Sequence, residues 1–349
     1  MGRIMTSSVG RGGVPILDET DLALTDALQL NPRVSWTTLS EVLDLSPVTL
    51  ARRWQALVRA RTAWTCITLE GPTFRGAIVE VACKPGTAVD VAAAFTPLPH
   101  IATVGITVGE YDLFALVVAP TVDAISAVLL DGLPITPDVT RVSSHVYTGM
   151  LGGGRWRHGV LNRAQREQVR SDLGPPPKEL RPLSADDRAL YLALGRDGRR
   201  SYTEVAQDLG TSPQVVKRRL DRLQRRGEIA FRCDVARPLA GWHAMAMLWL
   251  TAPDAEVGGI GRAIGEWRET RFCAPVVSRT NLCLIVSLRS VEHLDEIVLR
   301  LAAEHPQVTI AERRLVLRQV KVHGRLVDEH GRSTEVIPVD PWGMLPGAA

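Results

Sequence analysis

The sequence contains few cysteines and carries little net charge, and each of these shortages argues against a class of protein. The five cysteines, Cys66, Cys83, Cys233, Cys273 and Cys283, are widely spaced and contain no Cys-x-x-Cys pair. This pattern argues against a disulfide framework and a zinc site, and it favours free thiols in a reducing cytoplasm. Because 41 Lys+Arg face 38 Asp+Glu, any affinity for nucleic acid must come from local patches.

The sequence also lacks a long hydrophobic run. No apolar segment approaches the roughly 18 residues that a membrane span needs. Residues 1–16 are rich in glycine and serine without the apolar centre of a secretion signal, so we expect a disordered leader. With 349 residues, 45% hydrophobic and 23% charged, the chain has room for two or more ordinary globular domains. We expect a cytoplasmic protein without a membrane partner.

One pattern occurs twice in the sequence, 166 positions apart. Arg33-Val34-Ser35 matches Arg199-Arg200-Ser201, Ser46-Pro47 matches Ser212-Pro213, and Leu57 matches Leu223. The register holds over about fifty residues, which indicates an internal duplication. We assign residues 17–67 to the first copy and residues 183–233 to the second, and we call these segments the two heads.

Each head has the signals of a helix-turn-helix. In the second head, Ser201 and Glu204 form a capping box, Gly210 can end that helix in a left-handed turn, and Ser212-Pro213 begin the next one. Two short helices joined by a tight glycine turn are typical of this motif. In the last helix of each head, an apolar stripe is predicted to face inward. These stripes are Leu50, Trp54 and Leu57, and Val216, Leu220 and Leu223.

The outer faces of these last helices are basic. Ser212–Gly227 holds six Lys or Arg against one acid, and Ser46–Arg61 holds four arginines and no acid. Such a local excess suits phosphate neutralisation, and the second helix of the motif carries base contacts. We predict base contacts from Val48, Thr49, Arg52, Gln214, Lys217 and Arg218. We predict further DNA contacts from Ser46, Arg53, Arg59, Ser212, Arg219, Arg222 and Arg225. Because the two outer faces differ, we expect an asymmetric operator, unless two chains pair.

A different pattern follows each head, in residues 68–150 and 234–330. In the first, we predict elements at Ala77–Ala82, Thr87–Phe95, Ile101–Val108, Leu113–Ala119, Val122–Leu130 and Val139–Tyr147. In the second, we predict them at Met245–Leu250, Gly259–Trp267, Arg271–Val277, Leu282–Leu288, Val291–Glu304 and Thr309–Val322. The order βαββαβ is that of a ferredoxin-like sheet with one uncovered face. Two copies in one chain can bury these faces together, which gives an α+β fold.

The remaining segments are connections. Residues 151–182 combine Gly152–Gly154, a basic helical stretch over Arg163–Asp172 and Pro175–Pro177, and we interpret them as a linker with stiff and flexible parts. Residues 331–349 form a tail that we expect to be disordered after Val339, where proline and glycine accumulate.

These residues resemble the Lrp/AsnC family of bacterial and archaeal transcription factors. The resemblance rests on the duplicated head motifs and on Gly109-x-Tyr111-Asp112, which is similar to the Gly-x-Tyr-Asp turn of that family's effector domain. It implies winged-helix-like heads, binding to double-stranded DNA as a dimer or higher homo-oligomer, and an effector, often an amino acid, near this turn. It further implies ligand contacts from Gly109, Tyr111 and Asp112, whose carboxylate could take an ammonium group. A plain hairpin turn explains the same residues.

The sequence departs from the family in two places. Ser278-Arg279-Thr280-Asn281 stands where the second copy should have the turn, which puts a second effector site in doubt. Arg61 stands where a glycine normally follows the recognition helix, which puts the hinge of the first head in doubt.

Two other function classes stay open. Sirohaem decarboxylases share this architecture, but Ser144-His145-Val146-Tyr147 does not match their Ser-His-Cys-Tyr-type segment. We interpret His145 as a packed or surface residue, and no nucleophile–base pair, metal spacing or phosphate loop stands out. The other class is a ligand sensor that no longer binds DNA. We predict a regulator that is not an enzyme, with no catalytic residue, cofactor or metal.

Overall fold

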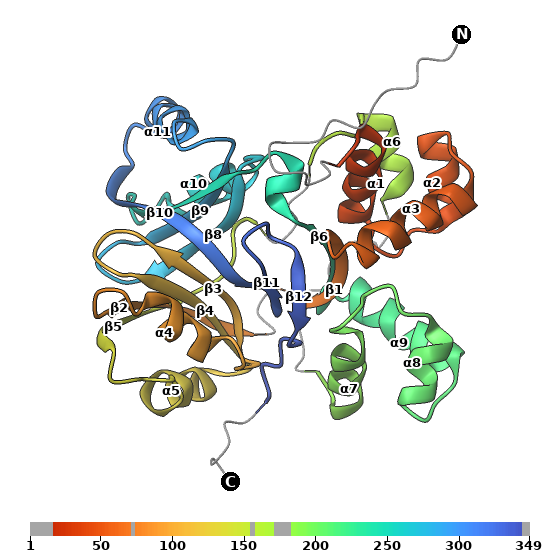
Figure 1. Cartoon of the computed structure of the whole chain (residues 1–349), viewed down its shortest axis with the longest axis horizontal. Coiled ribbons are helices and arrows are strands. Elements are labelled where there is room, and N and C mark those ends of the chain that lie inside the picture. Colours follow the sequence, from red (N-terminus) through yellow and green to blue (C-terminus); the bar gives the residue numbers. More distant parts are fainter. Residues whose placement is uncertain (1–16, 71–73, 154–157, 171–182, 344–349) are drawn as a thin grey trace.

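A computed structural model describes residues 17–70, 74–153, 158–170 and 183–343. It contains two helical heads, a short β-ladder between them, and a large closed sheet with helices on its outside (Figure 1). The predicted leader 1–16 and Pro175–Pro177 lie outside the described residues. In the described part of the chain, no helix is both long and apolar enough to cross a membrane.

Three helices build each head, as predicted. They are α1 (Glu19–Leu30), α2 (Trp36–Leu43) and α3 (Pro47–Arg59), and α7 (Ala185–Leu194), α8 (Tyr202–Asp208) and α9 (Pro213–Arg225). Ser46 and Ser212 cap α3 and α9 by accepting from the backbone N–H three residues later, and Pro stands at the first position of each helix. The capping box of Ser201 and Glu204 is confirmed, and both predicted inner stripes are buried.

The last helix of each head, α3 or α9, is the recognition helix of that head. The hinge that follows it has the same backbone shape in both heads. Gly227 has φ +59°, and Arg61, its counterpart, has φ 59°. The left-handed conformation is easy for glycine but strained for a residue with a Cβ. The hinge of the first head therefore has the backbone geometry of the second, and Arg61 carries the strain of the left-handed conformation.

Replacing Arg61 by glycine should stabilise the chain. Relief of the left-handed conformation contributes about 1–2 kcal/mol, from which the entropy of glycine subtracts about 0.5–1 kcal/mol. We expect the free energy of unfolding, measured by urea denaturation, to rise slightly in Arg61→Gly and to fall in Gly227→Ala. A less stable Arg61→Gly variant would contradict the assignment of strain.

A two-stranded ladder joins the heads. It consists of β1 (Ala63–Leu69) and β6 (Ile229–Val235), which the sequence did not predict as strands. Cys66 lies opposite Arg232, its own counterpart 166 residues later, and Ala63 lies opposite Val235, the counterpart of Leu69. Such pairing places a local twofold axis through Cys66 and Arg232. The heads consequently lie on either side of the ladder as a twofold pair (Figure 1).

The large sheet is built by two modules with the predicted element order. The first contains β2 (Arg75–Cys83), α4 (Ala88–Phe95), β3 (Ile101–Thr107), β4 (Leu113–Ala119), α5 (Val122–Asp131) and β5 (Val139–Tyr147). The second contains β7 (Ala244–Thr251), α10 (Val257–Gly265), β8 (Thr270–Val277), β9 (Leu282–Leu288), α11 (His293–Glu304) and β10 (Thr309–Val322). Every predicted boundary lies within two residues of the observed one.

The modules close on each other through two equivalent contacts. The strand order is β10-β3-β4-β2-β5-β8-β9-β7, and β7 pairs with β10 to complete the ring. Thr107 lies opposite Val316, and Tyr147 lies opposite Val276. Because Val316 and Val276 follow Tyr147 and Thr107 by 169 residues each, the two contacts are related by a twofold axis.

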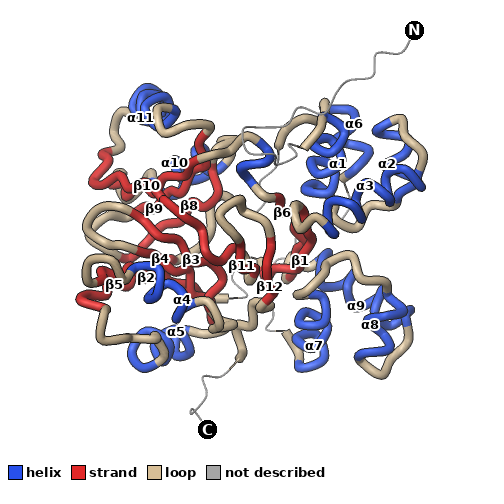
Figure 2. The backbone as a smooth tube through the Cα atoms, viewed as in Figure 1, coloured by secondary structure: helices blue, strands red, loops and turns tan. Residues whose placement is uncertain are grey.

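Helices cover the outside of this ring, and side chains from both modules fill its interior. Figure 2 shows α4 and α5 on one side of the strands, with α10 and α11 on the other. Inside, Ile78 and Phe114 of the first module pack in one cluster with Met247 and Ile285 of the second. Side chains of both modules therefore meet in the interior of the closed sheet.

The linker and the tail hold the heads in place. Helix α6 (Arg163–Val169) confirms the predicted helical stretch and lies against the first head. The buried Asp26 carboxylate accepts from three successive backbone N–H groups that precede α6 at 2.7–2.8 Å. Beyond β10 come β11 (Arg325–Val327) and β12 (Ser333–Val336), which were not predicted. The prediction of a disordered tail after Val339 is wrong for residues 340–343, because Trp342 packs edge-on against Tyr191 of the second head, and residues 344–349 lie outside the described residues.

Candidate nucleic-acid interface and effector site

The predicted base-contact residues lie on the outer faces of α3 and α9. Val48 is 77% exposed, and Arg52, Gln214, Lys217 and Arg218 are exposed as well. Thr49 is half-buried, and its hydroxyl lies 2.8 Å from the Ser46 hydroxyl. Lys217 donates to the half-buried Asp221 at 2.6 Å across one helical turn, so a partner of Lys217 must displace this carboxylate.

Some of the arginines predicted to contact DNA bind carboxylates of their own head. Arg53 contacts Asp18 at 2.8 Å and Asp21 at 2.9 Å. In the second head, Arg219 pairs with Asp186 and Arg222 with Asp187, each at 2.7 Å. These pairs join the recognition helix to the first helix of its head. By contrast Arg52, Arg59, Arg218 and Arg225 are exposed, and no carboxylate pairs with them in the part of the chain that the structure describes.

The ion pairs of the first head shift the pKa values of both partners. Burial works against the charge of Asp18, but hydrogen bonds from the Asp21 backbone and from Arg53 lower its pKa. Burial, followed by the charge of Asp18, raises the pKa of Asp21. Although burial opposes it, hydrogen bonding to both carboxylates raises the pKa of Arg53. Arg53 is therefore held as a cation inside its head.

The turn Gly109–Asp112 joins β3 to β4. Gly109 has φ +116°, which favours glycine. Asp112 accepts from the Cys83 N–H at 2.7 Å through its carboxylate, and its own N–H donates to Val81 at 2.9 Å. The ring of Tyr111 lies under two guanidinium groups, with Arg141 at 4.5 Å and Arg314 at 5.0 Å from its centroid. Part of this turn is thus fixed by local bonds, and two guanidinium groups pack on its tyrosine ring.

The second module fixes its turn in the same way without an acid. The Asn281 side chain accepts from the Ala252 N–H at 3.0 Å, and its backbone N–H donates to Leu250 at 3.2 Å. Asn281 is the counterpart of Asp112 and does the same structural work. The carboxylate charge of Asp112 is therefore not needed to form the turn.

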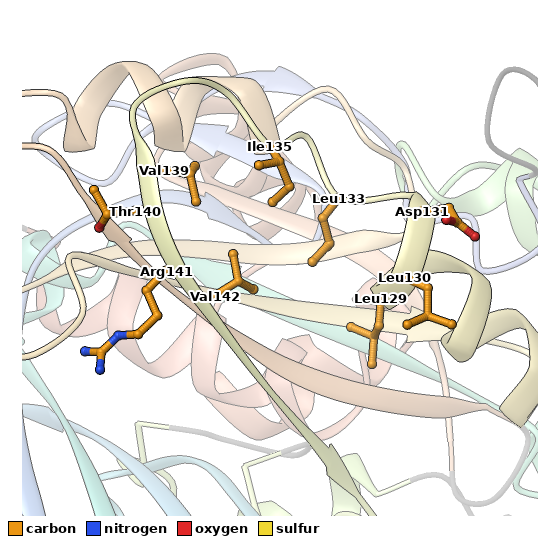
Figure 3. A pocket seen from close by; sticks show the side chains of 9 residues that line it. All are labelled: Leu129, Leu130, Asp131, Leu133, Ile135, Val139, Thr140, Arg141 and Val142. Atoms are coloured by element: carbon orange, nitrogen blue, oxygen red, sulfur yellow. The ribbon is translucent and has the colours of Figure 1, made fainter.

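An open hollow of about 620 Å³ lies beside this turn, between the end of α5 and β5. Figure 3 shows the side chains around it, which are mainly apolar. They are Leu129, Leu130, Asp131, Leu133, Ile135, Val139, Thr140, Arg141 and Val142. Arg141 belongs both to this lining and to the cover of Tyr111, and it pairs with Glu110 at 2.8 Å. The hollow thus offers apolar surface next to a half-exposed cation.

Substituting Asp112 distinguishes a role in ligand binding from a role in forming the hairpin turn, the two roles that the sequence left open. Asp112→Ala should lower the free energy of unfolding by about 1–3 kcal/mol, because the Cys83 N–H loses its acceptor. Asp112→Asn should cost less, since Asn281 already fills this role in the second module. If Asp112 holds an ammonium group, both variants lose affinity for an amino-acid effector in calorimetric titration. Unchanged affinity in Asp112→Asn would leave only the structural role.

A buried polar network crosses the interior of the closed sheet. Glu80 accepts from Trp249 at 3.1 Å, pairs with Arg314, and lies 3.0 Å from Nε2 of His145. Nδ1 of His145 lies 2.7 Å from the Ser278 hydroxyl. Burial disfavours the charge of Arg314, but hydrogen bonds to Glu312 and the charge of Glu80 raise its pKa.

In this arrangement a serine, a histidine and a glutamate form a chain of hydrogen bonds. No nucleophile–base pair stood out in the sequence, because Glu80 lies on β2, His145 lies on β5 and Ser278 directly follows β8. A catalytic base is oriented by a third group, but here the glutamate also binds Arg314 and Trp249. We therefore assign the network to the stability of the closed sheet.

Family models match three parts of the chain. The AsnC-type helix-turn-helix domain matches residues 17–58 and 183–224, and the Lrp/AsnC ligand binding domain matches residues 76–151. An uncharacterised HTH-type transcriptional regulator of Pyrococcus abyssi is 26% identical over 143 residues, which are 41% of this chain and 90% of the relative. Another, from Sinorhizobium fredii, is 26% identical over 143 residues, covering 40% of this chain and 85% of the relative.

Among solved structures, the siroheme decarboxylase NirDL is similar along nearly the whole chain. The comparison gives a TM-score of 0.57 at 13% identity and covers 90% of this chain and 96% of that one. At this identity the likeness shows the fold alone. The chain therefore contains two AsnC-type helix-turn-helix domains and a Lrp/AsnC ligand-binding domain, and it is similar to HTH-type transcriptional regulators.

Proposed function

We propose that the chain is a cytoplasmic, sequence-specific transcriptional regulator that binds double-stranded DNA through α3 and α9. The observation that carries this proposal is the twofold pair of heads, each presenting an exposed arginine, Arg52 or Arg218, on its recognition helix. Arginine at this place can bind a guanine edge with two hydrogen bonds. The AsnC-type helix-turn-helix domains and the HTH-type relatives support the same function.

The residues of the proposed interface divide into three groups. Val48, Thr49, Arg52, Gln214, Lys217 and Arg218 would contact base edges. Arg59 and Arg225 would neutralise phosphates near the ends of their helices. Ser46, Arg53, Ser212, Arg219 and Arg222 stay in the proposal as residues that shape the interface, and the ion pairs of these three arginines favour positioning over direct phosphate contact.

We further propose that a small molecule binds at the turn Gly109–Asp112 and modulates the regulator. The nearby hollow combines apolar lining with Arg141, which suits a ligand that bears a carboxylate and an apolar side chain, such as an amino acid. Each module is ferredoxin-like in this proposal, and chains associate into dimers or larger assemblies. Sedimentation with and without amino acids tests the last point.

Recovery of genomic fragments by the purified chain tests DNA binding. The full chain would be mixed with sheared DNA of its own genome, and bound fragments would be sequenced at moderate salt. We expect a small set of enriched sites that share one sequence, and the enrichment should disappear with Arg52→Ala/Arg218→Ala. Uniform recovery of all fragments would contradict a sequence-specific regulator.

The alternative is an enzyme with the activity of the siroheme decarboxylase whose fold is similar. That likeness covers 90% of the chain but rests on 13% identity. Titration with an iron porphyrin, followed by its absorption spectrum, distinguishes the two functions. A stoichiometric spectral shift would favour the enzyme, whereas no shift together with selective DNA binding favours the regulator.

A further inference from the structure

A reciprocal pair of arginines, Arg33 and Arg199, joins the two heads. They occupy the same position in the two copies, and each donates to the backbone carbonyl groups that flank the other. The accepting oxygens are those of Gly198, Arg200, Pro32 and Val34. The contact is therefore symmetric about the axis that relates the heads, and we call these two residues the arginine clamp.

Aromatic rings complete the clamp on both sides. The guanidinium of Arg33 lies 4.7 Å from the ring centroid of Tyr202, and that of Arg199 lies 4.2 Å from the ring centroid of Trp36. Tyr202 and Trp36 are also counterparts, each the first residue of its helix. Burial, followed by the charge of Arg33, lowers the pKa of Arg199 to about 10, which leaves Arg199 a cation at neutral pH. Each guanidinium is thus held by two carbonyl groups and the ring at the start of the other head's second helix, and that of Arg33 also lies 5.4 Å from the ring centroid of Phe231.

The ladder between the heads adds further contacts. The hydroxyl of Thr65 on β1 donates to Asp197 at 2.7 Å, and the backbone carbonyl of Thr65 accepts from the Gly198 N–H at 3.2 Å. A Cβ on Gly198 would lie 3.1 Å from the Cys66 backbone, which shows how closely the second head approaches β1. These bonds leave the heads little freedom to rotate or separate.

The two recognition helices, α3 and α9, carry different residues at a position that would contact bases. Arg52 and Arg218 are counterparts, so both heads present an arginine at one position. At the start of the helix the first head has exposed Val48, and the second has exposed Gln214. An apolar side chain suits a thymine methyl group, whereas glutamine suits adenine. The two heads therefore share one contact and differ in another.

Resting on the DNA-binding function proposed above, we propose that a single chain binds an inverted repeat of two non-identical half-sites at one fixed spacing set by the arginine clamp. The inverted orientation follows from the twofold axis through Cys66 and Arg232. The fixed spacing follows from the clamp and the Thr65 contacts. The difference between the halves follows from Val48 and Gln214. Arg33 and Arg199 are positioning residues that do not touch DNA.

The first test varies the distance between the half-sites of the selected operator. Duplexes with about 1, 2, 5 or 10 added base pairs would be titrated with the full chain, because about 10 base pairs make one helical turn. We expect one optimum, with affinity at least tenfold lower at about 2 added pairs and lower still at half a turn. In Arg33→Ala/Arg199→Ala the optimum should broaden, so that the penalty for small insertions shrinks to a few-fold.

Arg33→Lys/Arg199→Lys is the matched control, because lysine keeps the charge but lacks the planar fork. It should also broaden the optimum, which a general loss of positive charge does not explain. An equally sharp optimum in both double variants would overturn the role of the clamp. A flat spacing profile in the unmodified chain would overturn the fixed geometry even if the variants fail to fold.

The second test exchanges the outer face of the first head. Val48→Gln/Thr49→Val gives the first head the same two residues that the second has at these positions, and Val48 is too exposed to affect the core. We expect preference to move at least tenfold from the asymmetric operator toward a symmetric repeat of the second half-site. Unchanged preference would contradict the assignment of the two halves.

The outcomes separate this inference from the proposed function. Selective binding with one operator for each chain, calculated from the mass of the complex, supports the inference whether or not the chains associate with each other. Selective binding with two chains per operator overturns it and leaves the regulator function intact. Absence of selective binding by the unmodified chain overturns the function and the inference together.

Discussion

Removing both Arg52 and Arg218 should reduce affinity for the operator by about 30-fold to 10⁴-fold. Each arginine that binds guanine with two hydrogen bonds contributes about 1–3 kcal/mol of discrimination, so two such contacts contribute about 2–6 kcal/mol. The effects should add, because the two side chains lie on separate heads. Fluorescence anisotropy with the selected operator measures the loss, and binding to random duplex should fall much less.

The matched control for this prediction is Arg262→Ala. Arg262 is an exposed arginine on α10, on the outside of the closed sheet and away from the recognition helices. It should leave operator affinity within about twofold, since it removes one positive charge without a base contact. Equal losses in the control and in Arg52→Ala/Arg218→Ala would show that overall charge, rather than base contact, explains the binding.

Replacing Glu80 by alanine should destabilise the chain by about 3–5 kcal/mol, the usual cost of leaving one partner of a buried ion pair alone. Glu80 and Arg314 are 3% and 2% exposed at their side chains. Without the carboxylate of Glu80, Arg314 keeps the half-exposed Glu312 as its carboxylate partner among the described residues, and Trp249 loses its acceptor. Thermal and urea unfolding of the full chain measure the loss. The exposed pair of Glu110 and Arg141 is the control, and Glu110→Ala should cost less than about 1 kcal/mol.

A double variant shows whether the stability lost in Glu80→Ala comes from leaving Arg314 without its charge partner or from losing packing contacts. In Glu80→Leu/Arg314→Leu both charges are absent, and well-packed apolar replacements of buried pairs are often neutral or stabilising. We expect this variant to recover much of the stability that Glu80→Ala loses. If the double variant is the less stable of the two, packing rather than an unpaired charge determines the effect.

The duplication explains why this network is asymmetric. Glu80 and Trp249 are counterparts 169 residues apart, and so are His145 and Arg314. In a dimer of identical chains, each pair would consist of two equal residues at the axis. A fused chain can place a carboxylate opposite an indole and a histidine opposite an arginine. The same freedom lets the two recognition helices diverge.

The sequence predicted the elements whose signals are local. Caps such as Ser46 and Ser212, the apolar stripes and the alternating strands depend on neighbours within a few positions, and the structure has them within two residues. The strand β1 was missed because its only partner in the ladder, β6, lies in the other unit. Trp342 was missed because its packing on Tyr191 joins residues from two distant segments.

In the candidate interface, too, features with local signals were predicted and features that depend on distant segments were missed. The exposure of Val48, Arg52 and Arg218 follows from helical periodicity and was predicted. The engagement of Arg53 by Asp18 and Asp21 depends on how α3 crosses α1, which periodicity does not contain. The arginine clamp was also missed, because each arginine binds backbone carbonyl groups, and carbonyl groups leave no trace in the sequence.

Anisotropy of the full chain with its selected operator and with a scrambled duplex, at about 50 and 200 mM salt, is the decisive test of sequence-specific binding. We expect affinity for the operator at least about 10³-fold above that for the scrambled duplex, and a steep loss of both as salt increases. Equal affinity for the two duplexes, or binding that salt does not weaken, would contradict a regulator that recognises DNA through two basic recognition helices.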